Sequence, residues 1–383
     1  MPDSKIVFCT NCGAKNSTDS KFCINCGKPL VKSNVQVIDS TSNDNEESIN
    51  SSNKQGVMDN VTSHINAWTG GKGAVKVSLS EFFSQVFRRH TTEEAEELFI
   101  VGTDKTTPSL SEIVNDKVQP WLFSRVLGFV LAIGILMYFL LGLLPAYGIW
   151  ISMDAFLAVA VPLSALVLFF ECNVFQNISF YQVTKMALLG GVLSLIVTIL
   201  FVNFFGNREL DLLGALQTGF VEELSKVLVA AYFVYKIKAK RIFNGLLIGA
   251  AVGTGFAAFE NVEYMFNDKT GQIASMQEAI GRTMFSISDH TEWCAIATAA
   301  LVMVIAGKQL SSSDFFNFKF LRFLLLVMII YALWDWNALN QFGTLRYMAL
   351  AVATWIVVFV FIHAGLREVK LLQSETKDSQ INI

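Results

Sequence analysis

Residues 222–226, Glu-Glu-Leu-Ser-Lys, place two carboxylates and an ammonium group inside residues 212–234, a stretch that is otherwise mostly apolar. Its length and composition are typical of a transmembrane helix. Each charge at the centre of such a helix costs ~2.5–3.5 kcal/mol on insertion scales. Glu222 and Glu223 lie four and three residues before Lys226, so ion pairing offsets part of this cost. A structural ion pair is one interpretation, and a functional polar site inside the bilayer is the favoured one.

Further polar side chains lie in, or directly before, the three apolar spans that follow. They are Glu260 and Asn261, then Arg282 and His290, then Tyr331 and Asp335. If consecutive spans cross the bilayer in alternating directions, the ionisable groups of the four spans reach a similar depth, in the outer half of the membrane. We therefore predict one site with Glu222, Glu223, Glu260, His290 and Asp335 as catalytic residues and Lys226, Asn261, Arg282 and Tyr331 as supporting residues.

This set of side chains suits activation of water for attack on a peptide carbonyl. One glutamate could act as the general base, and His290 or a nearby backbone amide could stabilise the oxyanion. The same glutamate, histidine and aspartate side chains could instead hold a divalent metal ion. The sequence leaves both mechanisms open, and it lacks the HExxH motif of zincins. A serine protease built on Ser225 is a weaker alternative, because Ser225 lacks the strained glycine-flanked setting of an exposed nucleophile.

The order of these motifs resembles that of the PrsW family of intramembrane proteases, which is distantly similar to CaaX prenyl proteases and bacteriocin-immunity-type membrane proteins. The residues that carry the resemblance are Glu222-Glu223-x-x-Lys226, Phe256-x-x-x-Glu260-Asn261, the stretch from Arg282 to His290, and Leu333-Trp334-Asp335. The resemblance covers about residues 120–366. It implies a site-one-type cut in a membrane-anchored substrate, with anti-sigma factors as the best-known substrate class.

One position departs from the family pattern. Similar proteins often have histidine where this chain has Tyr331, four residues before Asp335. A phenol can donate a hydrogen bond, but it is a poor metal ligand. Tyr331 therefore favours a second class of function, a non-catalytic membrane scaffold or sensor. An ion-coupled transporter is a third class, although no internal repeat or pair of broken helices supports it.

The composition fits a membrane protein. The chain has 383 residues, of which 53% are hydrophobic and 16% charged, whereas soluble proteins carry about 25% charged residues. We predict an all-α polytopic membrane protein in contact with the lipid bilayer, with about eight transmembrane helices. The predicted spans are 122–144, 154–170, 184–205, 212–234, 243–265, 284–306, 320–338 and 345–364. The net charge of −3 gives no reason to expect nucleic-acid binding.

Basic residues gather in alternate loops, which predicts the orientation. They lie at 236–241, 308–322 and 367–370, and an eight-span topology places all three segments on one side. By the positive-inside rule this side is the cytoplasm, and both termini lie there. Residues 1–30 contain no apolar h-region, so we expect no signal peptide. The expected location is the bacterial plasma membrane.

Two C-x-x-C knuckles mark the N-terminus. Cys9 and Cys12 form the first, Cys23 and Cys26 the second, and a glycine follows each. Four thiolates at this spacing predict a structural zinc ribbon over residues 1–30, with Zn²⁺ supplying most of its folding energy. Two disulfides are a weaker alternative. The ribbon suggests docking of a cytoplasmic protein partner, and reduced zinc-binding thiolates agree with the predicted orientation.

The remaining segments connect these parts. Residues 31–73 are rich in Ser, Asn, Asp and Glu, which predicts a disordered linker. Residues 74–120 are predicted to form one or two amphipathic juxtamembrane helices. Their signals are a shared face for Phe82, Phe83, Val86 and Phe87, and a helix start with acidic residues at Thr92. The protease-like domain is expected at 121–366 and a cytoplasmic tail at 367–383.

Overall fold

The computed structural model describes residues 6–8, 15–17, 48–76, 78–144, 147–206, 208–267 and 288–381. The chain divides into two compact units, residues 1–53 and 54–383. In the first unit, β1 (Ile6–Phe8) pairs antiparallel with β2 (Lys15–Ser17), with Val7 opposite Asn16. The four cysteines of the predicted zinc ribbon lie outside the described residues.

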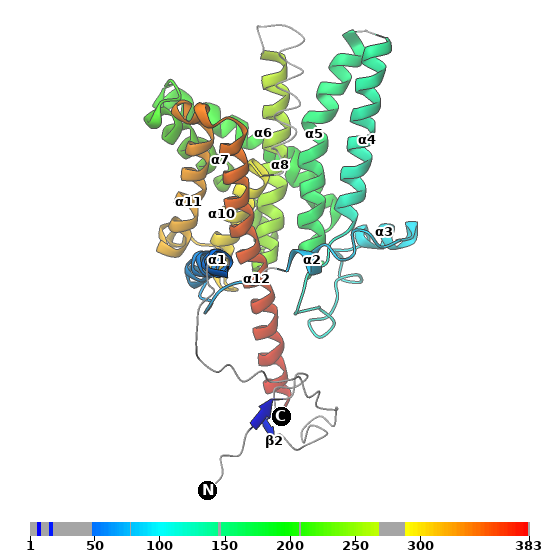
Figure 1. Ribbon diagram of the computed structural model, residues 1–383, viewed down its shortest axis with the longest axis vertical. Helices are drawn as coiled ribbons and strands as arrows, with labels where there is room; N and C mark the ends of the chain where they lie inside the picture. The colour runs from blue at the N-terminus through cyan, green and yellow to red at the C-terminus, as the bar shows by residue number, and fades with distance from the viewer. Residues whose placement is uncertain are drawn as a thin grey trace. The chain divides into compact units, whose positions relative to one another are not determined.

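The second unit is a bundle of apolar helices (Figure 1). A helix occupies each predicted span: α4 (Leu122–Leu143), α5 (Tyr147–Cys172), α6 (Phe180–Phe205), α7 (Leu212–Ile237), α8 (Ile242–Asn267), α10 (His290–Ile305), α11 (Phe318–Asp335) and α12 (Thr344–Ile381). Within the described ranges, five of them are long and apolar enough to cross a membrane, namely α4, α5, α6, α8 and α12. The charges of α7 and α11 and the 16-residue length of α10 set these three helices apart. The predicted all-α membrane fold is confirmed.

Helix α5 begins at Tyr147 and not at residue 154, and helix ends also differ from the prediction near the site and at the C-terminus. Helix α10 begins at His290, whereas the predicted span began at residue 284. His290 therefore lies at the start of its helix and not several residues inside it. Helix α12 continues to Ile381, through the predicted tail, because residues 366–381 contain neither glycine nor proline to end it.

The predicted linker is wrong over its last part. Residues 48–68 form helix α1 (Ser48–Trp68) despite their polar composition. Tertiary contacts anchor its final turn: Arg367 on α12 donates to the Asn66 side chain at 3.2 Å and to the Thr69 carbonyl oxygen at 2.7 Å. The Trp68 ring meets Phe323 on α11 edge-on, with ring centroids 5.5 Å apart. These contacts with distant helices are not visible in the local composition.

The juxtamembrane segment contains two short helices, α2 (Leu79–Phe82) and α3 (Thr92–Phe99). The expected start of α3 is confirmed, and Thr91 and Glu94 form a capping box there. The expected shared face of 82–87 is wrong, because α2 ends at Phe82. Phe82 is buried, whereas Phe87 is 94% exposed.

Glycines on α8 allow close packing against α10. Gly245, Gly249 and Gly253 are spaced four residues apart and form a small-residue face on α8. In the structure this face meets α10, where a Cβ atom at Gly253 would collide with the carbonyl oxygen of His290. The α8–α10 contact therefore fixes the start of the His290 helix against the helix of Glu260.

Two glutamates cap the first turns of neighbouring helices at one end of the bundle. Glu171, at the end of α5, accepts hydrogen bonds from the backbone amides of Trp121, Leu122 and Phe123 at 2.8, 2.8 and 2.9 Å, at the start of α4. Glu368 on α12 accepts from the amide of Ile242 at 2.8 Å, at the start of α8. Both carboxylates satisfy amides that lack partners inside their own helices.

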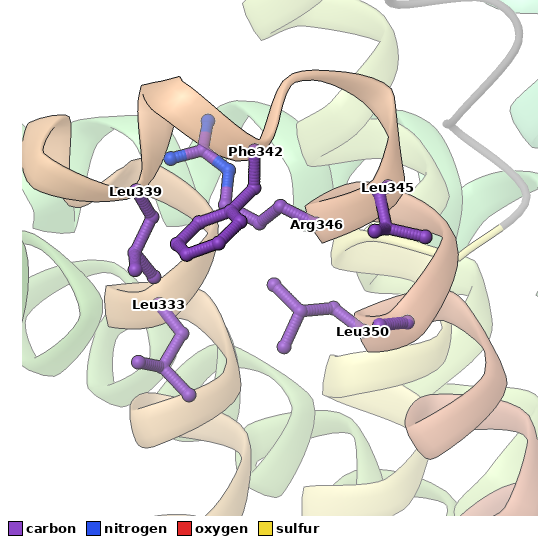
Figure 2. Close-up of a pocket in the computed structure, with 7 residues that line it drawn as sticks. Leu333, Leu339, Phe342, Leu345, Arg346 and Leu350 are labelled. Atoms are coloured by element: carbon purple, nitrogen blue, oxygen red, sulfur yellow. The ribbon is translucent and has the colours of Figure 1, made fainter.

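An apolar pocket lies at the other end of the bundle, between α11, α12 and the short 3-10 helix η2 (Asn337–Phe342) (Figure 2). Its volume is about 260 Å³. The lining residues are Leu333, Leu339, Phe342, Leu345, Arg346, Ala349 and Leu350. Arg346 is 8% exposed and donates to the carbonyl oxygen of Trp336 at 2.9 Å. The lining contains no carboxylate, imidazole or thiol, so this pocket is not where the chemistry takes place.

Candidate active site

Three ionisable side chains from three helices converge inside the bundle. Glu222 comes from α7, Glu260 from α8 and His290 from α10, and one candidate ligand atom of each lies within 4.8 Å of the others. Glu260 and His290 are buried, at 7% and 6% exposure, and Glu222 is half-buried. The predicted meeting of these residues is present in the structure.

A continuous row of polar contacts joins this group to Glu223. The Lys226 Nζ atom lies 2.6 Å from Glu223 Oε1 and 2.6 Å from His290 Nδ1. His290 Nε2 in turn lies 2.7 Å from Glu260 Oε2. A lysine ammonium has only donors, so Nδ1 accepts and the proton of a neutral ring sits on Nε2, which donates to Glu260.

The two adjacent glutamates have different partners. Consecutive residues on a helix point about 100° apart, so Glu222 and Glu223 cannot face the same neighbour equally. Glu223 is fully buried and pairs with Lys226, whereas Glu222 Oε2 is 4.0 Å from Nζ. The structure thus explains two acids for one base, since one carboxylate pairs with the lysine and the other enters the group with Glu260 and His290.

Helix α11 approaches the site because Gly219 lies one turn before Glu222. A Cβ atom at Gly219 would lie 2.8 Å from the carbonyl oxygen of Met328. A residue larger than glycine therefore does not fit at this position. This approach brings the Tyr331 hydroxyl to Glu222 Oε2, to which it donates at 2.7 Å. The Phe256 ring on α8 lies under Lys226, with Nζ 4.5 Å from the ring centroid. This cation–π contact partly replaces the water that burial removes from Lys226.

Other predicted site residues lie apart from this group or outside the described residues. Asn261 donates to the carbonyl oxygen of Ala158 on α5 at 3.3 Å, which is a packing contact. Asp335 is the half-buried last residue of α11 and is not one of the three clustered ligands. Its catalytic role stays a prediction. Arg282 lies outside the described residues, as do Cys9, Cys12, Cys23 and Cys26.

The serine-protease alternative does not fit the geometry. Ser225 is fully buried, and its hydroxyl donates to the carbonyl oxygen of Val221 at 2.6 Å. Both ring nitrogens of His290 contact other side chains, Lys226 and Glu260. No hydrogen bond joins this serine to the histidine that would have to activate it.

The clustered side chains fit a divalent metal ion. Imidazole and carboxylate groups are both zinc ligands, and catalytic zinc commonly has three protein ligands and a fourth position for water. Among the described residues, this is the group whose ligand atoms come close enough to share an ion. Glu260 and His290 now contact each other at 2.7 Å, and both would have to give up this contact to bind the same ion.

The part of the chain that contains these side chains matches a known protein family. Residues 179–364 match the sequence model of a family described as PrsW family intramembrane metalloprotease. This part of the chain is therefore similar to the PrsW family. The match contains all of α7, α8, α10 and α11 and therefore every residue of the cluster. It begins later than the resemblance predicted from the sequence, which started at about residue 120.

Two further comparisons bear on the chain. Residues 8–30 match a zinc-ribbon domain family, which confirms the predicted N-terminal module. Over 139 residues the chain is 27% identical to Protease PrsW of Halalkalibacterium halodurans, an alignment that covers 35% of this chain and 61% of that protein. The chain therefore spans less than two thirds of the length of this relative. No solved structure matches the chain.

Sequence reasoning missed two residues that shape the site. Gly219 sets the distance between α7 and α11. Trp293 is fully buried, and its ring stacks on Tyr331 with centroids 5.0 Å apart. Both lie three residues from a predicted catalytic residue, Gly219 before Glu222 and Trp293 after His290. On a helix this spacing places them on the same face, a signal that was available in the sequence.

Proposed function

We propose that the membrane domain hydrolyses peptide bonds in membrane-anchored proteins, with a divalent metal ion held by Glu222, Glu260 and His290. The observation that carries the proposal is the approach of their ligand atoms to within 4.8 Å, inside the part of the chain that is similar to the PrsW family. A metal ion in such a site polarises a carbonyl group and lowers the pKa of bound water.

The side chains of the chain have distinct tasks in this proposal. His290 would bind through Nε2, so the proton that Nε2 now donates to Glu260 has to leave. Glu222 and Glu260 each supply a carboxylate oxygen. Lys226 contacts Nδ1 and keeps the imidazole ring oriented, while Glu223 balances the charge of Lys226. Orientation of a ligand by a neighbouring group is a common property of metal sites.

A metal-free mechanism, in which Glu222 or Glu260 activates water directly, is the second candidate. The half-buried position of Glu222 favours it, because water can reach this carboxylate. The metal-dependent form has the stronger support, because a cation between Glu222 and Glu260 relieves the repulsion of two adjacent carboxylates.

The substrate and the orientation follow from the same proposal. The substrate is a membrane-anchored protein of the anti-sigma-factor type, cut by site-one cleavage in the outer half of the bilayer. The basic segment Lys236–Arg241 then faces the cytoplasm together with both termini. The zinc ribbon provides a docking module for a cytoplasmic protein, and zinc in the ribbon is structural.

A cleavage assay on the full-length protein in nanodiscs tests this function. The substrates are single-span membrane proteins from the same cell, and the variants are Glu222→Gln, Glu260→Gln and, as a control on the same helix, Glu263→Gln. We expect cleavage by wild type and by the control, and loss in the other two. Chelator should abolish cleavage, and Cys9→Ser should still cleave, since its lesion is confined to the ribbon. Cleavage that survives Glu222→Gln and Glu260→Gln would contradict the proposal.

A further inference from the structure

We propose that Tyr331 is a positioning residue that holds one carboxylate oxygen of Glu222 and leaves the other oxygen for a metal ion. The inference rests on the proposed function and adds how the ligand set is fixed. The Tyr331 hydroxyl donates to Glu222 Oε2 at 2.7 Å. Oε1 of the same carboxylate is then the atom that remains to bind a metal ion.

Glu222 needs such a partner more than the other two ligands do. Its side chain is 13% exposed, and Lys226 is 4.0 Å from it, which is the limit of an ion pair. Glu260 and His290 by contrast hold each other at 2.7 Å. A glutamate side chain has three rotatable bonds, and fixing them costs conformational entropy. Because the buried Tyr331 hydroxyl already holds the Glu222 side chain, less conformational entropy is lost when a metal ion binds.

The Tyr331 ring is itself held in place. It stacks on Trp293 at 5.0 Å between centroids with 30° between the ring planes, and it meets the His290 ring edge-on at 5.3 Å. Trp293 is fully buried, and its Nε1 donates to Thr354 Oγ1 on α12 at 3.1 Å. Helix α12 contributes none of the three ligands, yet it supports Glu222 through Thr354, Trp293 and Tyr331.

Cobalt titration of the full-length protein, with zinc already in the ribbon, tests this role. Absorbance from thiolate-bound Co²⁺ would reveal any exchange into the ribbon, so binding at the membrane site is followed separately. We expect Tyr331→Phe to weaken Co²⁺ binding roughly tenfold, as loss of an outer-shell partner commonly does. The ring and its stacking on Trp293 remain in this variant. Tyr232→Phe, an exposed tyrosine on α7, is the matched control and should bind as wild type does.

A double-mutant cycle separates positioning from a general structural effect. In a Glu222→Gln background, Tyr331→Phe should change Co²⁺ affinity by less than about twofold, because the two residues act as one unit. Trp293→Phe should weaken binding less than Tyr331→Phe, and Thr354→Val less again.

Three outcomes would overturn the inference. Equal affinity of wild type and Tyr331→Phe would contradict it and leave the proposed function intact. A full tenfold effect that persists in the Glu222→Gln background would show that Tyr331 acts by another route. Absence of Co²⁺ binding to wild type would overturn the metal-dependent function, and the role of Tyr331 with it.

Discussion

The carboxylates of the bundle fall into two sets with different partners. At one end, Glu171 and Glu368 accept hydrogen bonds from backbone amides at the starts of α4 and α8. In the interior, Glu223 and Glu260 contact the side chains of Lys226 and His290. Glu171 and Glu368 are half-buried, as Glu222 is, and Glu223 and Glu260 are buried. Only the interior set is surrounded by groups that can exchange protons.

This difference separates carboxylates that stabilise the fold from those suited to chemistry. A backbone amide neither moves nor titrates, so Glu171 and Glu368 act as fixed caps on neighbouring helices. Imidazole, ammonium and carboxylate groups can change protonation state and partner. Burial alone therefore does not identify a site among these glutamates, whereas the chemical type of the partner does.

The largest effect is expected on activity, from His290→Ala. This change removes the side chain that links Lys226 to Glu260 and supplies the nitrogen ligand. Cleavage should fall by more than roughly 100-fold, because loss of a proposed ligand should cost at least as much as loss of a group that orients one, which commonly costs 10–100-fold. Initial rates in nanodiscs, with circular dichroism as the folding control, measure it. A folded His290→Ala protein with wild-type cleavage rates would show that the interior side chains do not take part in the reaction.

The next effect concerns stability, from Lys226→Met. Lys226 and Glu223 are both fully buried, and removing one partner of a buried pair typically costs about 3–5 kcal/mol. Thermal and denaturant unfolding in detergent micelles should show this loss. The double variant Lys226→Met with Glu223→Leu should recover much of it, because no unpaired charge then remains. If the double variant is no more stable than the single one, the ion-pair explanation fails.

Glu171→Ala should have a smaller effect on stability and none on the site. It leaves three backbone amides at the start of α4 without their acceptor. We expect a loss of roughly 1–3 kcal/mol in unfolding free energy and unchanged Co²⁺ affinity. A marked change in Co²⁺ affinity would show that the two sets of carboxylates are coupled.

The smallest effect is expected from Glu368→Ala. This carboxylate accepts one amide hydrogen bond, from Ile242, and lies 3.7 Å from a guanidinium nitrogen of Arg241. The loss should be about 0.5–1.5 kcal/mol, the usual net value of one hydrogen bond. Unfolding of both variants, Glu368→Ala and Glu171→Ala, in the same micelles measures the difference. A larger loss of stability in Glu368→Ala would contradict the comparison.

Much of the interior set could be predicted from the sequence. Charges inside apolar spans are costly, so Glu222, Glu260 and His290 stand out in the sequence, and alternating span directions bring them to one level. The partner of each group could not be predicted, because it depends on which helices touch. The face formed by Gly245 and Gly253 meets α10. The α7–α11 contact depends on Gly219, which carries no polar group.

The backbone-capping set could not be predicted at all. Glu171 looks like an ordinary acidic residue at the end of an apolar span, and only the fold shows that it reaches the start of α4. The helical part of the predicted linker is similar, because Arg367 anchors Asn66 from a position 301 residues later in the chain. Contacts between such distant residues leave no local pattern.

The length of helix α12 can be compared with the thickness of a bilayer. Its 38 residues correspond to a rod ~57 Å long, about twice the ~30 Å hydrocarbon thickness of a bilayer. From Thr344 to Glu368, which closes the start of α8, the rod measures ~36 Å, close to one crossing. If this part of α12 makes one crossing, the remaining ~20 Å extends beyond the hydrocarbon, and we expect the last turns of the helix to lie out of reach of the lipid tails.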